Sequence, residues 1–182
     1  MKVFSGVKFV YALLIAALAL GAFAAPAVKA AEDTGSILDV VLATNAETGE
    51  FSILIAALQA ADDQTIIERL GSEKRTTVFA PTDAAFLALL EELGLTAEQL
   101  LSDEELVTRV LRYHIVRGKL PAAEVLAMEQ LRTLRAGVLL QSNGVLTDPN
   151  GRTANIIATD IEASKGFIHV IDRVLLPDLM AE

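Results

Sequence analysis

The apolar positions change their spacing about halfway along the chain. In the first half they recur three and four residues apart, as at Phe51, Leu54 and Leu58, which is typical of one face of an amphipathic helix. In the second half, short apolar runs alternate with turn signals. Asn143-Gly144 lies between two such runs and favours a tight β-hairpin, because both turn residues need positive φ. Helices followed by strands predict an α+β fold.

Capping residues and turn residues divide this pattern into elements. Helices are expected after Ser36, from Phe51, over Thr65–Leu70, after Thr82 or Asp83, after Thr96, after Ser102 and over Pro121–Met128. Thr96 with Gln99, and Ser102 with Glu105, have the spacing of a capping box. Strands are expected over residues 76–80, 138–142, 145–148, 156–161 and 167–176. No internal repeat or linker interrupts these elements, so they are expected to form one domain.

The first 30 residues have the order of a secretory signal peptide. Lys2 and Lys8 give a basic start, residues 9–25 are apolar and uncharged, and Val28-Lys29-Ala30 offers small residues at a signal peptidase spacing. Ala22-Phe23-Ala24 is a weaker second cleavage site. A retained membrane anchor is the alternative, but the apolar run is shorter than the roughly 20 residues of a usual span.

This pattern predicts a signal peptide over residues 1–30 and a single domain over residues 31–182 with its core over 36–177. The product is expected to be periplasmic or secreted, with no stable membrane insertion after cleavage. About 150 residues remain after cleavage, enough for one domain with its own core. The chain has no cysteine, so disulfides and thiolate metal sites are excluded.

The formal charge of the chain is −9, and the predicted signal peptide contains three lysines and no carboxylate. Cleavage would therefore leave a domain with a net charge near −12. Such a surface repels phosphate backbones and anionic lipid, which disfavours a nucleic-acid partner.

Three segments follow one another along the chain: Thr77–Phe86, Tyr113-His114 and Gly166–Pro177. In this order they resemble the signature segments of the fasciclin domain family. The resemblance extends from about residue 36 to residue 177 and implies a fasciclin-like wedge, in which a short twisted β-sandwich or a strongly twisted sheet packs against several helices. Its structural motif residues in this chain are Thr77, Phe79, Pro81, Thr82, Phe86, His169 and Asp172.

The chemistry of these segments has structural explanations. Phe79 and Phe86 are expected in the core, Pro81 ends a strand, and Thr82 caps the helix that follows. Asp172 is placed to pair with Arg173 as a weak surface ion pair.

No catalytic site is expected, and no metal or cofactor. His114 and His169 are the only histidines, and a metal site with Asp160 is disfavoured because neither has a second ligand at helical spacing. Both imidazoles are instead expected to be buried and hydrogen-bonded. No Gly-x-Ser-x-Gly elbow or Gly-rich phosphate loop is present.

The resemblance implies a non-catalytic adhesion or protein-interaction domain that acts outside the cytoplasm. Its partner would be a cell-surface or extracellular matrix protein or polysaccharide. By position, the family's receptor-binding regions correspond to Tyr113 and His114 and to Thr159, Asp160 and Ile161. The competing interpretation gives these residues architectural roles. A second functional hypothesis is a carrier of a small apolar ligand, such as a lipid or pigment, in a cavity lined by Leu and Val.

Overall fold

A computed structural model describes residues 35–61, 63–71, 74–135 and 137–178. The predicted signal peptide lies outside the described residues. The helices are α1 (Ile37–Thr48), α2 (Ser52–Ala60), α3 (Gln64–Leu70), α4 (Asp83–Leu93), α5 (Ala97–Ser102), α6 (Glu104–Tyr113) and α7 (Ala122–Ala127). The strands are β1 (Thr76–Pro81), β2 (Ile115–Arg117), β3 (Gln130–Arg132), β4 (Val138–Ser142), β5 (Val145–Thr147), β6 (Thr153–Ala163) and β7 (Gly166–Ile171).

Local capping explains where most helices begin and end. Ser36 and Asp39 form a capping box at α1, and Gly49 ends that helix in the left-handed conformation. Thr82 accepts a hydrogen bond from the Ala85 amide at the start of α4, as expected. These contacts lie within a few residues of one another, so the sequence predicts them well.

The predicted capping box at Thr96 and Gln99 is confirmed, whereas the one at Ser102 is wrong. Ser102 belongs to the last turn of α5, and its hydroxyl donates to the Gln99 carbonyl. Asp103 caps α6 instead, accepting from the Leu106 amide at 3.0 Å. A carboxylate at this position also favours the positive end of the helix dipole.

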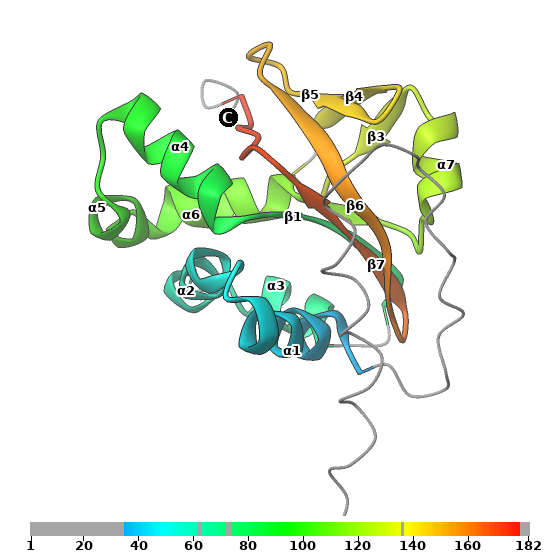
Figure 1. The fold of residues 1–182 in the computed structure, drawn as a ribbon, viewed down its shortest axis with the longest axis horizontal. Helices are drawn as coiled ribbons and strands as arrows, with labels where there is room; N and C mark the ends of the chain where they lie inside the picture. The colour runs from blue at the N-terminus through cyan, green and yellow to red at the C-terminus, as the bar shows by residue number, and fades with distance from the viewer. Residues whose placement is uncertain (1–34, 62, 72–73, 136, 179–182) are drawn as a thin grey trace, which may run out of the picture.

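The strands form one twisted sheet in the order β2-β1-β7-β6-β5-β4-β3. β1 and β7 are parallel, and the other neighbours are antiparallel. The sheet curls until its outer strands meet, where Val116 pairs with Thr133 and the Leu134 amide donates to the Ile115 carbonyl. α1 to α6 gather on one side of the sheet, and α7 lies apart from them (Figure 1). The expected α+β wedge, in its twisted-sheet form, is confirmed.

Several strand predictions need correction. β2 and β3 were not predicted, because each has only three residues and too little periodicity to recognise. The strand expected over residues 167–176 ends at Ile171, although the Asp172 amide still donates to the Asn155 carbonyl of β6 at 3.1 Å. Asp172 does not pair with Arg173 and instead accepts two hydrogen bonds from Asn155, both at 2.7 Å.

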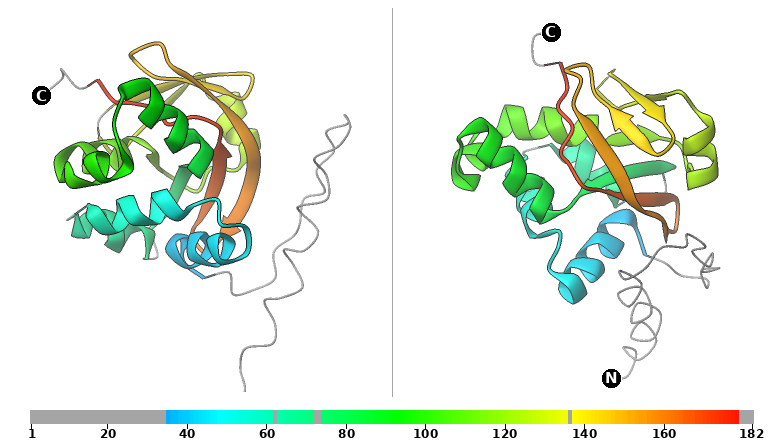
Figure 2. Two further views of the ribbon diagram at one scale, coloured as in Figure 1. Left: turned by 60° about the vertical axis from the view of Figure 1, so that its left-hand side comes forward. Right: turned by 45° about the horizontal axis from the view of Figure 1, so that its top comes forward.

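Two apolar clusters lie on opposite faces of this sheet. The first fills the space between the sheet and α1 to α6, and it includes Ile37, Leu54, Ile66, Phe86, Leu89 and Ile168. The second fills the inside of the curled sheet, and it includes Phe79, Tyr113, Leu131, Leu139, Leu146, Ile171 and Leu175. Two further views show α1 to α6 on one side and the β4–β5 hairpin away from them, next to α7 (Figure 2).

Thr77 connects the central strand to the loop that follows β2. Its hydroxyl donates to the Gly118 carbonyl at 2.8 Å and accepts from the Leu120 amide at 2.9 Å. The side chain is fully buried, so these bonds satisfy a polar group that would otherwise destabilise the core. The loop that leads to α7 is thereby attached to β1.

Gly166 begins β7 at a place where two backbones nearly touch. A Cβ atom at this position would lie 1.9 Å from the Thr76 carbonyl oxygen and 2.7 Å from Ile37 Cδ1. Residue 166 pairs with residue 76 in the parallel ladder, so neither strand can move without disturbing the central pairing.

We predict that Gly166→Ala lowers the free energy of unfolding by about 3 kcal/mol, because the added methyl group overpacks the β1–β7 contact. Gly71→Ala is the control, since its φ is −87° and its added Cβ would meet only the Ile67 carbonyl at 3.3 Å. Urea denaturation of both variants measures the difference. Equal losses of stability would contradict this account of Gly166.

Candidate interaction site

Tyr113 ends α6 inside the curled sheet. Its side chain is almost completely buried, and its hydroxyl donates to the Val138 carbonyl at 3.0 Å. Gly137 leaves room for the ring, because a Cβ there would lie 2.6 Å from Tyr113 Cε2. Burial, and to a smaller extent the nearby Asp148 carboxylate, raises the pKa of the Tyr113 hydroxyl. The phenol therefore stays protonated and holds the start of β4 against α6.

His114 follows Tyr113 and uses both ring nitrogens inside the protein. Nδ1 lies 2.8 Å from the Val110 carbonyl, so this nitrogen carries the proton. Nε2 accepts from the Leu175 amide at 3.2 Å. Burial lowers the pKa of His114 to about 4, against smaller opposing effects of the Val110 carbonyl and Asp148. The neutral imidazole thus joins α6 to the C-terminal segment.

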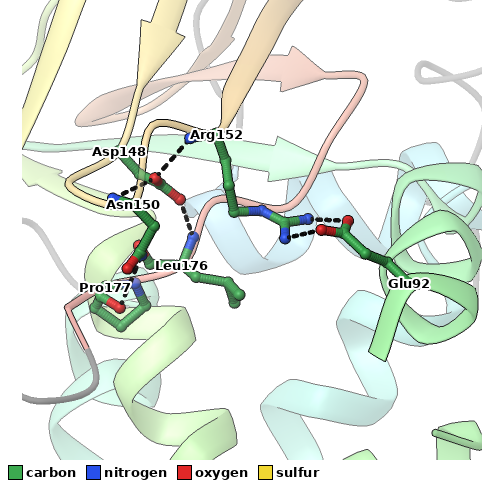
Figure 3. Close-up of polar contacts among 6 residues, drawn as sticks. All are labelled: Glu92, Asp148, Asn150, Arg152, Leu176 and Pro177. Carbon is green, nitrogen blue, oxygen red and sulfur yellow. Dashed lines mark hydrogen bonds and ion pairs between the residues drawn. The ribbon is translucent and has the colours of Figure 1, made fainter. Parts of the chain in front are cut away.

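The same C-terminal segment is held by the turn between β5 and β6 (Figure 3). Asp148 accepts from the Leu176 amide at 2.8 Å, and the Asn150 side chain donates to the Leu176 carbonyl at 3.0 Å. Arg152 reaches from this turn to Glu92 on α4 in a two-pronged ion pair, with both N–O distances at 2.7 Å. Turn, helix and C-terminal segment therefore form one hydrogen-bonded unit.

The second predicted receptor segment, residues 159–161, lies in an irregular part of β6. The pairing with β7 shifts register on both sides of Ala158, and Asp160 has φ 58°. The Asp160 carboxylate accepts from the Ala122 amide at the start of α7 at 2.7 Å. Its own amide donates to His169 Nδ1 at 3.3 Å. Asp160 tolerates the left-handed conformation better than most residues, and these two bonds hold it there.

His169 contacts residues 159–161 from the inside of the sheet. It is fully buried, accepts from Asp160 through Nδ1, and donates through Nε2 to the Leu120 carbonyl at 3.0 Å. Its ring lies near Phe79 and Phe167, with centroids 5.6 and 6.4 Å away. Burial lowers the pKa of His169, against smaller effects of Leu120 and Asp160. The neutral ring is therefore the form that fits both bonds.

The bulge is open to solvent on its other side. Thr159 and Asp160 are exposed, and Ile161 is half-buried. Beside them, Lys119 forms an ion pair with Glu162 at 2.7 Å, and its ammonium lies 5.1 Å from the centre of the Phe167 ring. We call residues 159–161 the β6 bulge. It presents a hydroxyl, a carboxylate and part of an isoleucine on a supported backbone.

The structure does not bring all the predicted binding residues together. Tyr113 and His114 face the interior and the C-terminal segment, whereas the β6 bulge is at the surface beside α7. His169, which the sequence suggested only as a structural residue, is the side chain that contacts Asp160. The roles of Leu120 and Ala122 come from their backbone groups, so no side-chain pattern in the sequence identifies them.

The described residues provide neither a metal-ligand cluster nor an imidazole with an unbonded ring nitrogen. Within the described ranges, no group of three or more histidine and acidic side chains is placed to hold a metal ion. Neither imidazole has a free nitrogen for proton transfer. The helices of the described part are also all too short or too polar to cross a bilayer.

We predict that stability falls between about pH 7.5 and about pH 5, with about 2 kcal/mol of the loss due to His114. The folded pKa of His114 lies below its unfolded value near 6.5, so the unfolded chain binds more protons in this window. The stabilisation is complete above the unfolded pKa and is lost as pH falls toward the folded one. Urea denaturation at both pH values measures the change.

His114→Gln provides the control for this pH dependence. Glutamine keeps one donor and one acceptor but does not titrate. The variant should be less stable than the parent near pH 7.5 yet lose less stability on acidification. An unchanged pH dependence would show that His114 is not responsible.

Comparison with known proteins supports the resemblance seen in the sequence. A family model described as fasciclin domain matches residues 49–177. Protein sll1483 of Synechocystis is 39% identical over 153 residues, which cover 83% of this chain and 79% of that protein. Immunogenic protein MPB70 of Mycobacterium bovis is 30% identical over 146 residues, covering 79% of this chain and 72% of MPB70.

Other relatives are larger than this chain. Transforming growth factor-beta-induced protein ig-h3 of Sus scrofa is 33% identical over 144 residues, which cover 79% of this chain but 19% of that protein. The solved FAS1 domain pair of the insect cell adhesion molecule Fasciclin I has a TM-score of 0.55 and 20% identity, covering 71% of this chain and 46% of the solved chain. That structure shares the fold. Together with the match over residues 49–177, these relatives show that the chain belongs to the fasciclin domain family.

Proposed function

We propose that this domain is a non-catalytic adhesion or protein-interaction module that acts in the periplasm or after secretion. Its partner is a cell-surface or extracellular matrix protein or polysaccharide, and the β6 bulge is one surface that contacts it. The observation that carries the proposal is an exposed Asp160 held in place by the Ala122 amide and by buried His169. A supported loop loses little conformational entropy on binding, which favours affinity.

Two further observations agree with this role. The FAS1 domain pair with the same fold comes from a cell adhesion molecule. A general acid or base must reach its substrate, whereas both imidazoles here are buried and bonded to backbone groups. Export is supported by the basic, apolar and small-residue order of residues 1–30.

Tyr113 and His114 act indirectly in this proposal. They hold α6, β4 and the C-terminal segment together and do not reach a partner themselves. Their substitution is therefore expected to lower stability first and to affect binding only through the fold.

We predict that Asp160→Asn weakens binding to the envelope fraction of the host about tenfold, because a charge-assisted contact is lost. Asparagine keeps an oxygen for the Ala122 amide and tolerates positive φ, so the melting temperature should remain close to that of the parent. Sedimentation of purified protein with envelope fragments gives the affinity.

Glu98→Gln is the matched control, since Glu98 is an exposed carboxylate in the first turn of α5, far along the chain from the bulge. It should bind like the parent. Retention of full affinity by Asp160→Asn, or an equal loss in Glu98→Gln, would contradict a role for the β6 bulge.

A second candidate function, a carrier of a small apolar ligand, is favoured by one surface hollow. This hollow has a volume of about 500 Å³ and lies among α1, α2 and α3. Its apolar lining includes Leu38, Leu42, Ile55, Leu58 and Ile67. The volume is within the range of small-molecule sites. Native mass spectrometry of protein from its own host would show a bound lipid or pigment if this function holds, and only the free chain if it does not.

A further inference from the structure

Arginines face each other where the two ends of the sheet meet. Val116 on β2 pairs antiparallel with Thr133 after β3, and the Leu134 amide donates to the Ile115 carbonyl in the same register. Continued by one residue, this register places Arg117 opposite Arg132. Both arginines are exposed. Directly opposed residues of an antiparallel pair have Cβ atoms about 5 Å apart, so two like charges at this position repel each other.

These two charges have no acidic partner in the described part of the chain, as the ion pairs found there show. Lys119 differs, because Glu162 neutralises it, and Arg152 differs because Glu92 does so. A chain with a formal charge of −9 has many carboxylates available. Their absence beside Arg117 and Arg132 leaves a local positive potential on an acidic protein.

More guanidinium groups line a hollow next to this junction. The hollow has a volume of about 540 Å³, and its lining residues are Glu104, Glu105, Thr108, Arg109, Arg112 and Arg135. Arg109 pairs with Glu105, and Arg112 gives only its Nε to Asp63 at 2.6 Å. The terminal nitrogens of Arg112 therefore keep hydrogen-bonding capacity toward the hollow.

We infer that this surface binds a polyanionic polysaccharide, one that bears carboxylate or sulfate groups along its length. We call it the arginine seam and define it as Arg112, Arg117 and Arg132; Arg109 is left out because Glu105 neutralises it. It contains three of the 15 lysine and arginine residues of the chain. Planar guanidinium groups match carboxylate and sulfate oxygens in two-pronged hydrogen bonds. Several of them spread over a strand junction and a hollow suit repeated charges on one polymer.

A polysaccharide fits this surface better than a nucleic acid or a protein. Nucleic-acid grooves combine positive charge with aromatic side chains on which bases stack. None of the large exposed apolar side chains in the described part is aromatic. Protein interfaces usually concentrate affinity in buried Trp, Tyr and Arg anchors, and the seam offers only arginines at the surface.

The seam is separate from the β6 bulge, so the inference goes beyond the proposed function. Two strands, β1 and β7, lie between β2 and β6 in the sheet. Arg117 pairs with Thr76, on the face covered by the helices, whereas Asp160 contacts His169, which points toward the inside of the sheet with Phe79. A domain with two surfaces can join two partners, as adhesion requires.

The test measures binding of purified protein to immobilised alginate and dextran sulfate, with neutral dextran as the reference. We expect binding to both anionic polymers and not to dextran, with affinity that falls steeply as salt is added. Arg117→Gln and Arg132→Gln should each weaken binding by about five- to tenfold and reduce the salt dependence. Both side chains are exposed, so folding should be unchanged by circular dichroism.

Arg173→Gln is the matched control. Arg173 is exposed and has the same charge, but it follows Ile171, at the opposite end of the strands from the Thr76–Arg117 pair. It should bind within about twofold of the parent. Asp160→Asn should also keep full polysaccharide binding, which separates this inference from the function proposed for the bulge.

Three results would overturn the inference. One is equal binding to neutral dextran and to the anionic polymers at low salt. Another is an equal loss of polysaccharide binding in Arg173→Gln, which would indicate that binding depends on the net charge of the protein and not on a defined surface. The third is binding to polyglutamate without binding to either polysaccharide, which would assign the seam to an acidic protein partner.

Discussion

The parallel pairing of β1 and β7 is the contact on which the rest of the structure depends. These two strands come from segments about 90 residues apart and lie at the centre of the twisted sheet. One apolar cluster packs on each of their faces, so both clusters require the pair to be in register. The close approach of residue 166 to the Thr76 carbonyl shows how little freedom this register has. Parallel strands far apart in sequence form late and at high entropic cost, and the two cores offset that cost.

Buried polar groups add specificity to this apolar frame. His114, His169 and Thr77 are buried, and each connects two elements through backbone hydrogen bonds. An apolar side chain of similar size would fill the same space, but it would leave the Leu175 and Asp160 amides without these acceptors. Both histidines of the chain therefore connect elements of the fold through hydrogen bonds to backbone groups.

On the surface, some charged groups stabilise local structure and others do not. Most carboxylates lie at helix starts, in turns or in ion pairs, where they stabilise local structure. Where the two ends of the sheet meet, Arg117 and Arg132 have like charges on neighbouring strands, and their repulsion costs stability. The β6 bulge similarly holds Asp160 at positive φ. Strained backbone that the surrounding fold maintains is typical of ligand-binding and other functional surfaces. The like charges of Arg117 and Arg132 are a comparable local cost.

The sequence by itself determined the elements whose signals are local. Caps at Ser36, Thr82 and Thr96 and the Asn143-Gly144 turn depend on groups within four residues of each other, and each lies where the pattern predicted it. The three segments that resemble the family could also be recognised from the sequence. The apolar residues around His114 and His169 predicted that both imidazoles are buried, which the structure confirms. Ser102 failed as a cap because a neighbouring carboxylate competed for the same role.

Only the tertiary structure decided which distant residues meet. β2 and β3 have three residues each and exist because the curled sheet brings their edges together. The same closure places Arg117 opposite Arg132, although 15 positions separate them in the chain. Asp160, His169 and the Ala122 amide come together through a change of register in β6. Such contacts depend on the path of the whole chain through space, and no local periodicity or capping preference carries that information.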